Sequence, residues 1–325
     1  MRSSEIISVL QIKMLLLSLL VCIAALLQAS SASPVPASKK PRPVNLSYAC
    51  MRITGDGGDG DNKDDVPVIL IHGLGLSKEA WMGVYQLFAL KTKKRVCIVD
   101  LRNHGDSPWS DQSDVAAMAE DIKKFLDTLK VKKAIVLGHS LGGKVAVHFT
   151  LNYPDKVEKL IVEDMRPNGL TPLALQEVQV FLALLHKSSE IMPQGVSEKE
   201  AKKTIFKFLN EELGKLNASE LLNPKIVNFL PIRCKNGKCA WKTNTELVKY
   251  ILKDFQFLLN ESSGRYDGPT LFIYGTASPF KVNEEESSIK KLFPNAELVG
   301  VEGAFHVVHE REEFFNTVIN FINRK

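Results

Sequence analysis

The sequence predicts an α/β protein whose central sheet is mostly parallel, is flanked by helices and carries an inserted, mainly helical cap. Three observations support this prediction. Short apolar runs of strand length alternate with helical patterns in the first and last parts of the chain, as in parallel sheets. A glycine-rich turn joins one predicted strand directly to a helix. Residues 168–267 then break the alternation with mostly helical patterns, so this segment is expected to cover the sheet.

The N-terminus is predicted to lie outside the fold. An apolar run at 14–27 follows Lys13 and leads into small residues, which is the order of a cleaved secretory signal. We therefore assign residues 1–33 to a signal peptide and the proline-rich residues 34–43 to a linker. The run is short for a membrane span, so an uncleaved anchor is the weaker alternative. An organellar presequence is a further alternative, disfavoured by the acidic Glu5 and by the unbroken apolar run.

The 325 residues can bury one large core with an inserted subdomain, and the core is predicted in two parts, 44–167 and 268–325. The expected strands lie at 45–54, 66–71, 96–100, 134–137, 160–162, 270–274 and 297–301. The expected helices lie at 78–91, 115–129, 144–152 and 311–322. The cap at 168–267 adds helices and an Asn-Gly hairpin.

The turn after the strand at 134–137 carries the clearest chemical signal. Residues 138–142 read Gly-His-Ser-Leu-Gly between a β-branched strand and a helical pattern. Glycine at both flanking positions suits a turn too tight for side chains, and such a turn exposes the serine oxygen at the top of a sheet. The pattern predicts a nucleophile elbow with Ser140 as the nucleophile. A glycine-rich turn with an incidental serine is the alternative.

A serine hydroxyl is a weak nucleophile until a base takes its proton, and in such folds the partners follow in the order serine, acid, histidine. The base is expected in the loop after the last strand. His306 lies there. His309, three residues later, is the weaker candidate.

The predicted acid is less usual. No carboxylate directly follows the penultimate strand, and the glutamates at 284–286 come later, where a helix start explains them. Asp164 instead ends the strand after the elbow helix, at the edge where sites form in open α/β sheets. We therefore predict that Asp164 orients His306, that Glu163 faces the other side of the strand, and that Ser278 either supports the acid by a hydrogen bond or caps a turn.

Two backbone N–H groups are expected to bind the developing oxyanion. One belongs to Leu141, directly after the nucleophile, and the other to Leu74, between glycines in the loop after an early strand. His72 is predicted to be structural and to tie this loop down by a hydrogen bond. The nearby histidines His104, His139 and His148 are also predicted to be structural, since none combines a strand-end position with an acid and a nucleophile in the required order.

The cysteines follow the same prediction of export. Cys22 leaves with the signal, and Cys234 and Cys239 bracket the Asn-Gly turn, where they are expected to pair if the chain is exported but not in a reducing compartment. Cys97 is predicted to be an unpaired core residue, and Cys50 has no evident partner.

Three N-x-S sequons also fit export, with Asn45, Asn217 and Asn260 as candidate glycosylation sites. The net charge of +5 has both signs interspersed, and no basic stripe is interleaved with aromatics, so no nucleic-acid partner is expected. The cysteines lack zinc spacing, and neither a metal nor a cofactor is expected.

The elbow, the early glycine loop and the histidine loop together resemble the α/β-hydrolase superfamily. Longer runs resemble the abhydrolase domain-containing protein 11 group, namely V-D-L-R-N-H-G-D-S-P at 99–108, G-H-S-L-G-G-K at 138–144, P-T-L-F-I-Y-G-T-A-S at 269–278 and K-L-F-P-N-A-E at 291–297. The group's triad maps onto Ser140, Asp164 and His306. The resemblance implies an esterase or lipase acting on acyl esters, with diacylglycerol-type lipids as substrates. Group members are typically mitochondrial, so the mitochondrion is the alternative to the secretory pathway.

The leading hypothesis is therefore a serine hydrolase that forms an acyl-enzyme on Ser140. Its partner is a small-molecule or lipid ester, membrane contact is expected only through a lipid substrate, and the sequence leaves the oligomeric state open. The alternative is a non-catalytic protein that keeps the fold and binds a small apolar molecule. Candidates to line an acyl pocket, which can equally be packing residues of the cap, are Phe181, Leu182, Leu185, Phe255 and Phe257.

Overall fold

The computed structural model describes residues 41–53, 66–216, 222–246 and 262–324. The predicted signal at 1–33, most of the linker, two of the sequons (Asn217 and Asn260) and two of the candidate pocket residues (Phe255 and Phe257) lie outside the described residues. Within the described ranges, no helix has both the length and the apolar character that a membrane crossing requires.

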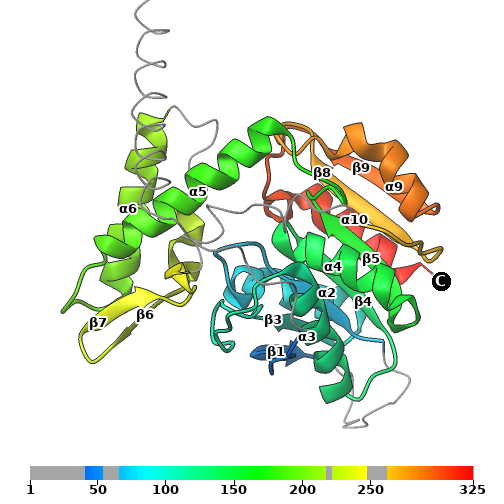
Figure 1. Ribbon diagram of the computed structural model, residues 1–325, viewed down its shortest axis with the longest axis horizontal. Helices are drawn as coiled ribbons and strands as arrows, with labels where there is room; N and C mark the ends of the chain where they lie inside the picture. Colours follow the sequence, from blue (N-terminus) through cyan, green and yellow to red (C-terminus); the bar gives the residue numbers. More distant parts are fainter. Residues whose placement is uncertain (1–40, 54–65, 217–221, 247–261, 325) are drawn as a thin grey trace, which may run out of the picture.

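A twisted sheet forms the centre of the described fold (Figure 1). Its seven described strands follow the order β1-β3-β2-β4-β5-β8-β9, and only β1 runs antiparallel to its neighbour. They are β1 (Tyr48–Met51), β2 (Val68–Ile71), β3 (Val96–Val99), β4 (Ala134–His139), β5 (Val157–Glu163), β8 (Thr270–Gly275) and β9 (Ala296–Val301). The central strands are almost continuously buried, as parallel strands are when helices cover both faces.

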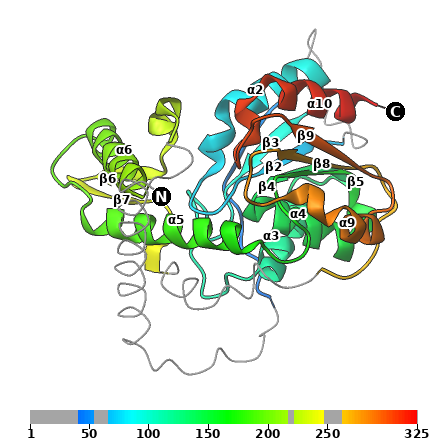
Figure 2. The same ribbon diagram turned by 90° about the horizontal axis from the view of Figure 1, so that it is seen from above.

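Helices cover the sheet on both sides (Figure 2). Three helices pack against one face, namely α3 (Val115–Thr128), α4 (Leu141–Asn152) and α9 (Glu286–Leu292). Two helices pack against the other face, namely α2 (Met82–Thr92) and α10 (Glu312–Asn323). Each face thus has its own apolar cluster. The predicted α/β fold with a mostly parallel sheet and flanking helices is confirmed.

Three short 3₁₀ turns precede or follow these elements. The turn η1 (Lys78–Trp81) leads directly into α2, so the single helix predicted at 78–91 begins as a tighter 3₁₀ turn. The turn η5 (Val308–Glu310) follows β9 and lies just after His306. A further turn, η4 (Val282–Glu285), precedes α9.

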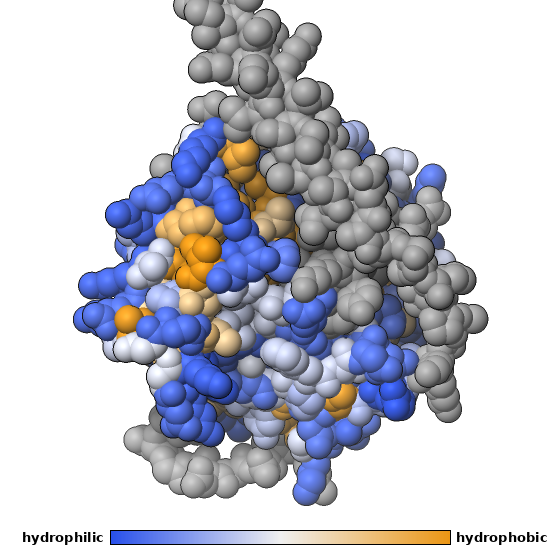
Figure 3. All heavy atoms as spheres, turned by 60° about the vertical axis from the view of Figure 1, so that its left-hand side comes forward, coloured by the Kyte–Doolittle hydropathy of each residue, from blue (hydrophilic) through white to orange (hydrophobic). Residues whose placement is uncertain are grey.

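The inserted segment between β5 and β8 forms a cap beside the sheet (Figure 1). Its described elements are α5 (Pro172–Glu190), α6 (Glu198–Lys215), η3 (Pro224–Phe229) and the hairpin of β6 (Ile232–Lys235) with β7 (Lys238–Trp241). Leu182, Ile205 and Trp241 belong to an apolar core of its own. Figure 3, which brings the cap side forward, shows apolar side chains gathered among charged ones.

Two disulfides join described residues, and one of them contradicts the sequence analysis. Cys234 and Cys239 are bonded across the β6–β7 hairpin, as the Asn-Gly turn suggested. Cys50 is bonded to Cys97, so the prediction of an unpaired Cys97 and of a Cys50 without partner is wrong. The reason is the antiparallel register of β1 on β3, which places these two residues directly opposite each other.

We expect loss of the Cys50–Cys97 bond to destabilise the protein more than loss of the hairpin bond. The two bonds span sequence separations of 47 and 5 residues, for which loop-closure entropy gives about 4 and about 2 kcal/mol. The free energy of unfolding of the Cys50→Ala variant, measured by chemical denaturation, should therefore fall further than that of the matched Cys234→Ala variant. Equal losses in the two variants would contradict this expectation.

Candidate active site

The turn from β4 into α4 holds Ser140 in a strained backbone conformation, with φ 52° and ψ −120°. The strain follows from close packing of backbones. A Cβ atom on Gly138 would overlap the carbonyl of Gly142, and a Cβ on Gly142 would overlap the carbonyl oxygen of Ile71 in β2. Both flanking positions therefore have to be glycine, and the tight turn presents the half-buried Ser140 to a cavity.

Asp164 lies immediately after β5 and is bonded to His306. The Nδ1 atom of His306 donates to Asp164 Oδ2 over 2.7 Å, which leaves Nε2 of that ring as the acceptor. Two further donors reach the carboxylate, since Ser278 Oγ donates to Oδ2 (2.5 Å) and the amide of Gly275 donates to Oδ1 (3.1 Å). Asp164 is only 1% exposed, so these three donors compensate for the removal of its charge from water.

Aromatic contacts hold the His306 ring in place. Phe280 stacks on it with 3.9 Å between the ring centroids and 6° between the planes, and the ring of His139 lies 4.8 Å away. Ser140 and His306 line the same cavity, but no hydrogen bond joins their side chains in the described part of the chain. In substrate-free sites such catalytic hydrogen bonds are often long and tighten only when substrate binds.

A second acid–histidine pair lies next to the first. Glu163 is fully buried, and its Oε1 accepts from the amides of Val308 and His309 and from His309 Nδ1, each over 2.8 Å. The pair fixes the turn that follows His306, and the His309 ring packs on Trp81. His309 is thus engaged by Glu163, whereas His306 is the histidine beside Asp164.

The loop after β2 lies against the elbow. A Cβ on Gly73 would come within 3.2 Å of Ser140 Cβ, so the backbone of the adjacent Leu74 runs close to the serine. Leu141 opens α4, and the first N–H groups of a helix have no acceptor within the helix. Both Leu74 and Leu141 line the cavity. The two residues predicted to supply the oxyanion donors therefore line the same cavity as Ser140.

Buried histidines brace this loop from below. The amide of Leu101 donates to His72 Nε2 (3.1 Å), and the amide of Gly75 donates to His104 Nε2 (3.1 Å). Desolvation by burial lowers the pKa of His72 to about 4 and the pKa of His104 to about 3. Both rings are therefore neutral near pH 7, which is the form that can accept these amides. Desolvation also lowers the pKa of His139 to about 3.

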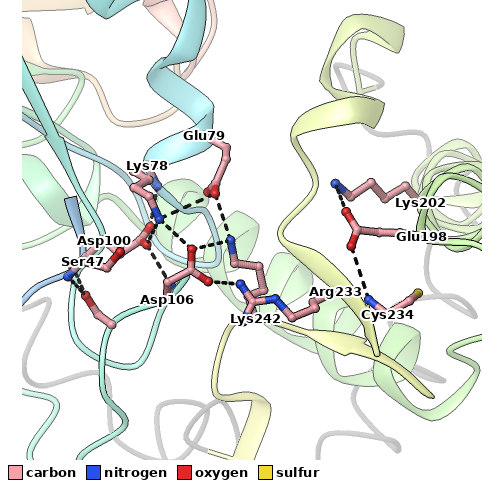
Figure 4. A network of polar contacts seen from close by, with 11 residues as sticks. Ser47, Lys78, Glu79, Asp100, Asp106, Glu198, Lys202, Arg233, Cys234 and Lys242 are labelled. Carbon is pink, nitrogen blue, oxygen red and sulfur yellow. Dashed lines mark hydrogen bonds and ion pairs between the residues drawn. The ribbon is translucent and has the colours of Figure 1, made fainter. Parts of the chain in front are cut away.

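Charged residues join the cap to the core beside the same loop (Figure 4). Lys242, just after β7, contacts Glu79 Oε1 at 2.9 Å and Asp106 Oδ2 at 3.2 Å. Lys78 contacts the same Asp106 oxygen at 2.8 Å, and Arg233 of β6 also pairs with Asp106. Because these groups come from η1, from the segment after β3 and from the cap hairpin, they hold the hairpin end of the cap against the core.

The next residue of the cap continues this contact into the loop itself. Thr243 Oγ1 donates to the carbonyl of Gly75 over 3.2 Å, and the amide of Asn244 donates to the carbonyl of Asn103 over 2.8 Å. The loop that carries Leu74 is thus held by the core on one side and by the cap on the other.

The cap and the sheet edge enclose a cavity of about 1440 Å³ with mostly apolar walls. Of the candidate pocket residues from the cap, Phe181 and Leu185 line it. Leu182 does not line it and is buried in the cap core instead, so for this residue the packing alternative is correct. The site also contains features that sequence reasoning missed, namely the Phe280 stack and the pairing of Glu163 with His309.

Comparison with known proteins places these observations in a family. A family model described as alpha/beta hydrolase fold matches residues 66–313. The chain is 32% identical over 284 residues to the sn-1-specific diacylglycerol lipase ABHD11 of Mus musculus, with 86% of each chain covered. It is 31% identical over 260 residues to abhydrolase domain-containing protein C22H12.03 of Schizosaccharomyces pombe, covering 79% of this chain and 92% of that one.

A solved structure described as a marine microorganism esterase is similar in three dimensions. It has a TM-score of 0.66 and 27% sequence identity, and the match covers 86% of this chain and 99% of that chain. The sequence matches and the match in three dimensions therefore both place the chain among hydrolases.

We expect the protein to lose stability on acidification because of its buried histidines. The pKa values of His72, His104 and His139 are lowered from 6.5 to about 4, 3 and 3, so below pH 6.5 the unfolded chain binds protons that the folded chain does not. The contribution of these neutral rings to the free energy of unfolding is fully present above pH 6.5 and is lost as the pH falls toward 4. Denaturant titrations at pH 7.5 and pH 5 should differ by about 2 kcal/mol for each of these histidines.

The His72→Gln variant provides the test of this origin, because glutamine keeps an acceptor for the Leu101 amide but does not titrate. Its pH dependence should be smaller than that of the wild type, and His186→Gln, at a histidine outside this cluster, is the matched control. A free energy of unfolding that is the same at the two pH values would refute the prediction.

Proposed function

The chain belongs to the alpha/beta hydrolase fold family, and we propose that it is a serine hydrolase that cleaves carboxylic esters. The observation that carries the proposal is the bond from His306 Nδ1 to the buried Asp164, on a ring that lines the same cavity as Ser140. An acid that fixes the tautomer of a histidine leaves the other ring nitrogen free to take a proton from a serine.

The proposed reaction has two steps. Ser140 Oγ attacks the ester carbonyl while His306 Nε2 takes its proton, and the same proton passes to the leaving alcohol when the carbon–oxygen bond breaks. Water then attacks the acyl-enzyme, giving its proton to His306, and the acid product leaves with Ser140 restored. Asp164 stabilises the protonated imidazole of His306, and the backbone N–H groups of Leu74 and Leu141 bind the oxyanion in both steps.

We propose lipid esters, such as diacylglycerol, as the substrate class. A cavity of about 1440 Å³ with apolar walls, including Phe181 and Leu185, has room for long acyl chains. Relatives from Mus musculus and Danio rerio carry the name sn-1-specific diacylglycerol lipase, and their matches cover 86% of this chain. Contact with a membrane would then occur through the lipid substrate.

A non-catalytic protein that binds a small apolar molecule is the second candidate. The same apolar cavity would serve it, and the missing hydrogen bond between Ser140 and His306 is the observation in its favour.

Reaction with a fluorophosphonate and turnover of p-nitrophenyl butyrate test the proposal. We expect the wild-type protein to be labelled at Ser140 and to hydrolyse the ester, and we expect Ser140→Ala to lose both activities. Asp164→Asn should lower kcat by roughly 10³–10⁴-fold, because it removes the charge that stabilises the imidazolium. A folded wild-type protein that shows neither labelling nor turnover would support the second candidate.

Glu163→Gln is the matched control for the acid, because it neutralises the neighbouring buried carboxylate, which holds His309 rather than His306. Its kcat should fall far less than that of Asp164→Asn. An equal or larger fall would transfer the role of the acid to Glu163.

We propose that the protein is exported, with residues 1–33 as a cleaved signal. The two disulfides support this, because such bonds persist in oxidising compartments, and Asn45 of the first sequon is exposed. When the full-length sequence is expressed in a secretory eukaryotic cell, the protein should appear in the medium with residues 1–33 removed. Treatment with a peptide N-glycosidase should increase its mobility, and Asn45→Gln should reduce that change. Recovery in mitochondria without glycans would favour the alternative location instead.

A further inference from the structure

The helix α5 crosses the cavity beside the proposed catalytic histidine. At its start, Thr171 Oγ1 donates to the carbonyl of Pro279 over 2.7 Å, next to the Phe280 that stacks on His306. Further along, the ring of Phe181 lies so close to Gly75 that a Cβ there would overlap it. The helix therefore passes from the side of the site that holds His306 to the loop that carries Leu74.

Glu177 lies between these two points. It is one helical turn before Phe181, on the same side of the helix, and its half-buried side chain lines the cavity. Burial raises the pKa of Glu177, and the electrostatic effects of His306 and Asp164 follow, the first lowering the pKa and the second raising it. The carboxylate is thus within electrostatic range of the reacting groups.

No described residue forms a hydrogen bond or an ion pair with Glu177. The other charged groups around the cavity either have a hydrogen-bond or ion-pair partner or are exposed to solvent. Glu310 accepts from Asn223 over 2.9 Å, and Lys215 is exposed and pairs with Glu212 at 2.6 Å. Lys225 is exposed on η3 of the cap. Among the described residues of the cavity wall, Glu177 is therefore the carboxylate whose charge faces an entering molecule uncompensated.

We propose that Glu177 sets the charge preference of the site, so that it accepts uncharged esters and esters with a cationic group near the scissile bond, and rejects esters with a carboxylate or phosphate there. The proposal rests on the proposed ester hydrolase function. An anionic group entering this apolar cavity would lose water beside a like charge that no partner neutralises. For two unit charges several ångströms apart at an effective dielectric constant of about 20, the repulsion corresponds to roughly ten- to a hundredfold in kcat/KM.

The test uses three p-nitrophenyl esters of matched length, namely the uncharged pentanoate, the anionic hydrogen glutarate and the cationic 4-(trimethylammonio)butanoate. Their kcat/KM values are compared within each protein at low ionic strength, where screening is weakest. We expect Glu177→Gln to raise the anionic-to-neutral ratio by roughly tenfold or more and to lower the cationic-to-neutral ratio. Glu177→Lys should reverse the order of the charged esters.

Glu190→Gln is the matched control, because Glu190 is an exposed acid of the same helix that does not line the cavity. Its ratios should equal those of the wild type. Opposite changes for the two charged esters distinguish a charge-selecting role from a structural one, because a general loss of packing would move all three esters in the same direction. Thermal unfolding verifies that Glu177→Gln is folded.

Ratios that are the same in the wild type and Glu177→Gln would overturn the inference while leaving ester hydrolysis in place. Absence of turnover in all proteins would instead overturn the proposed function. In that event the charge preference is still measured in a Ser140→Ala background, as competition of the three esters with a fluorescent apolar probe. There, Glu177→Gln should again favour the anionic ester, and an unchanged order of affinities would contradict the inference.

Discussion

The close approach of three backbone segments constrains everything else around the site. The end of β2, the turn after β4 and the start of α4 meet at Gly138 and Gly142, where a single added Cβ would overlap a carbonyl group. Because side chains are excluded there, the turn can bring Ser140 up to the cavity with a positive φ, a conformation that costs free energy and persists only when its surroundings fix it. The same contact brings the loop carrying Leu74 alongside the serine, so the proposed nucleophile and the proposed oxyanion donors are positioned by one packing requirement.

Each buried carboxylate near the site has a different partner. Asp164 and Glu163 are neighbours in sequence, yet one is bonded to His306 and the other to His309. Successive residues at the end of β5 thus separate two carboxylates that would otherwise repel each other, and each holds one histidine of the same loop. Below the site, Arg102 and Asp121 form a fully buried ion pair with 2.6 Å between Nε and Oδ2. Arg102 belongs to the run at 99–108 and Asp121 to α3, so the pair ties this run to the helix.

The cap makes the site a cavity rather than an open sheet edge. Its hairpin end is held by Lys242 and by Thr243, close to the loop that carries Leu74. The helix α5 supplies Phe181 and Glu177 to the cavity wall. On the proposed function, the strand ends carry the reacting groups and the inserted segment forms part of the wall that a substrate meets.

The sequence by itself determined the local features. The glycines around Ser140, the alternation of strands and helices, and the order of serine, acid and histidine are all short-range patterns, and they predicted the fold and the positions of Ser140, Asp164 and His306. Only the tertiary structure decided which distant segments meet. The bond between Cys50 and Cys97 depends on an edge strand that turns back antiparallel. The pairing of Glu163 with His309, the stacking of Phe280 on His306 and the place of Glu177 in the cavity wall join segments far apart in the chain. Such contacts depend on how whole elements pack, and no pattern within a single segment of sequence encodes that packing.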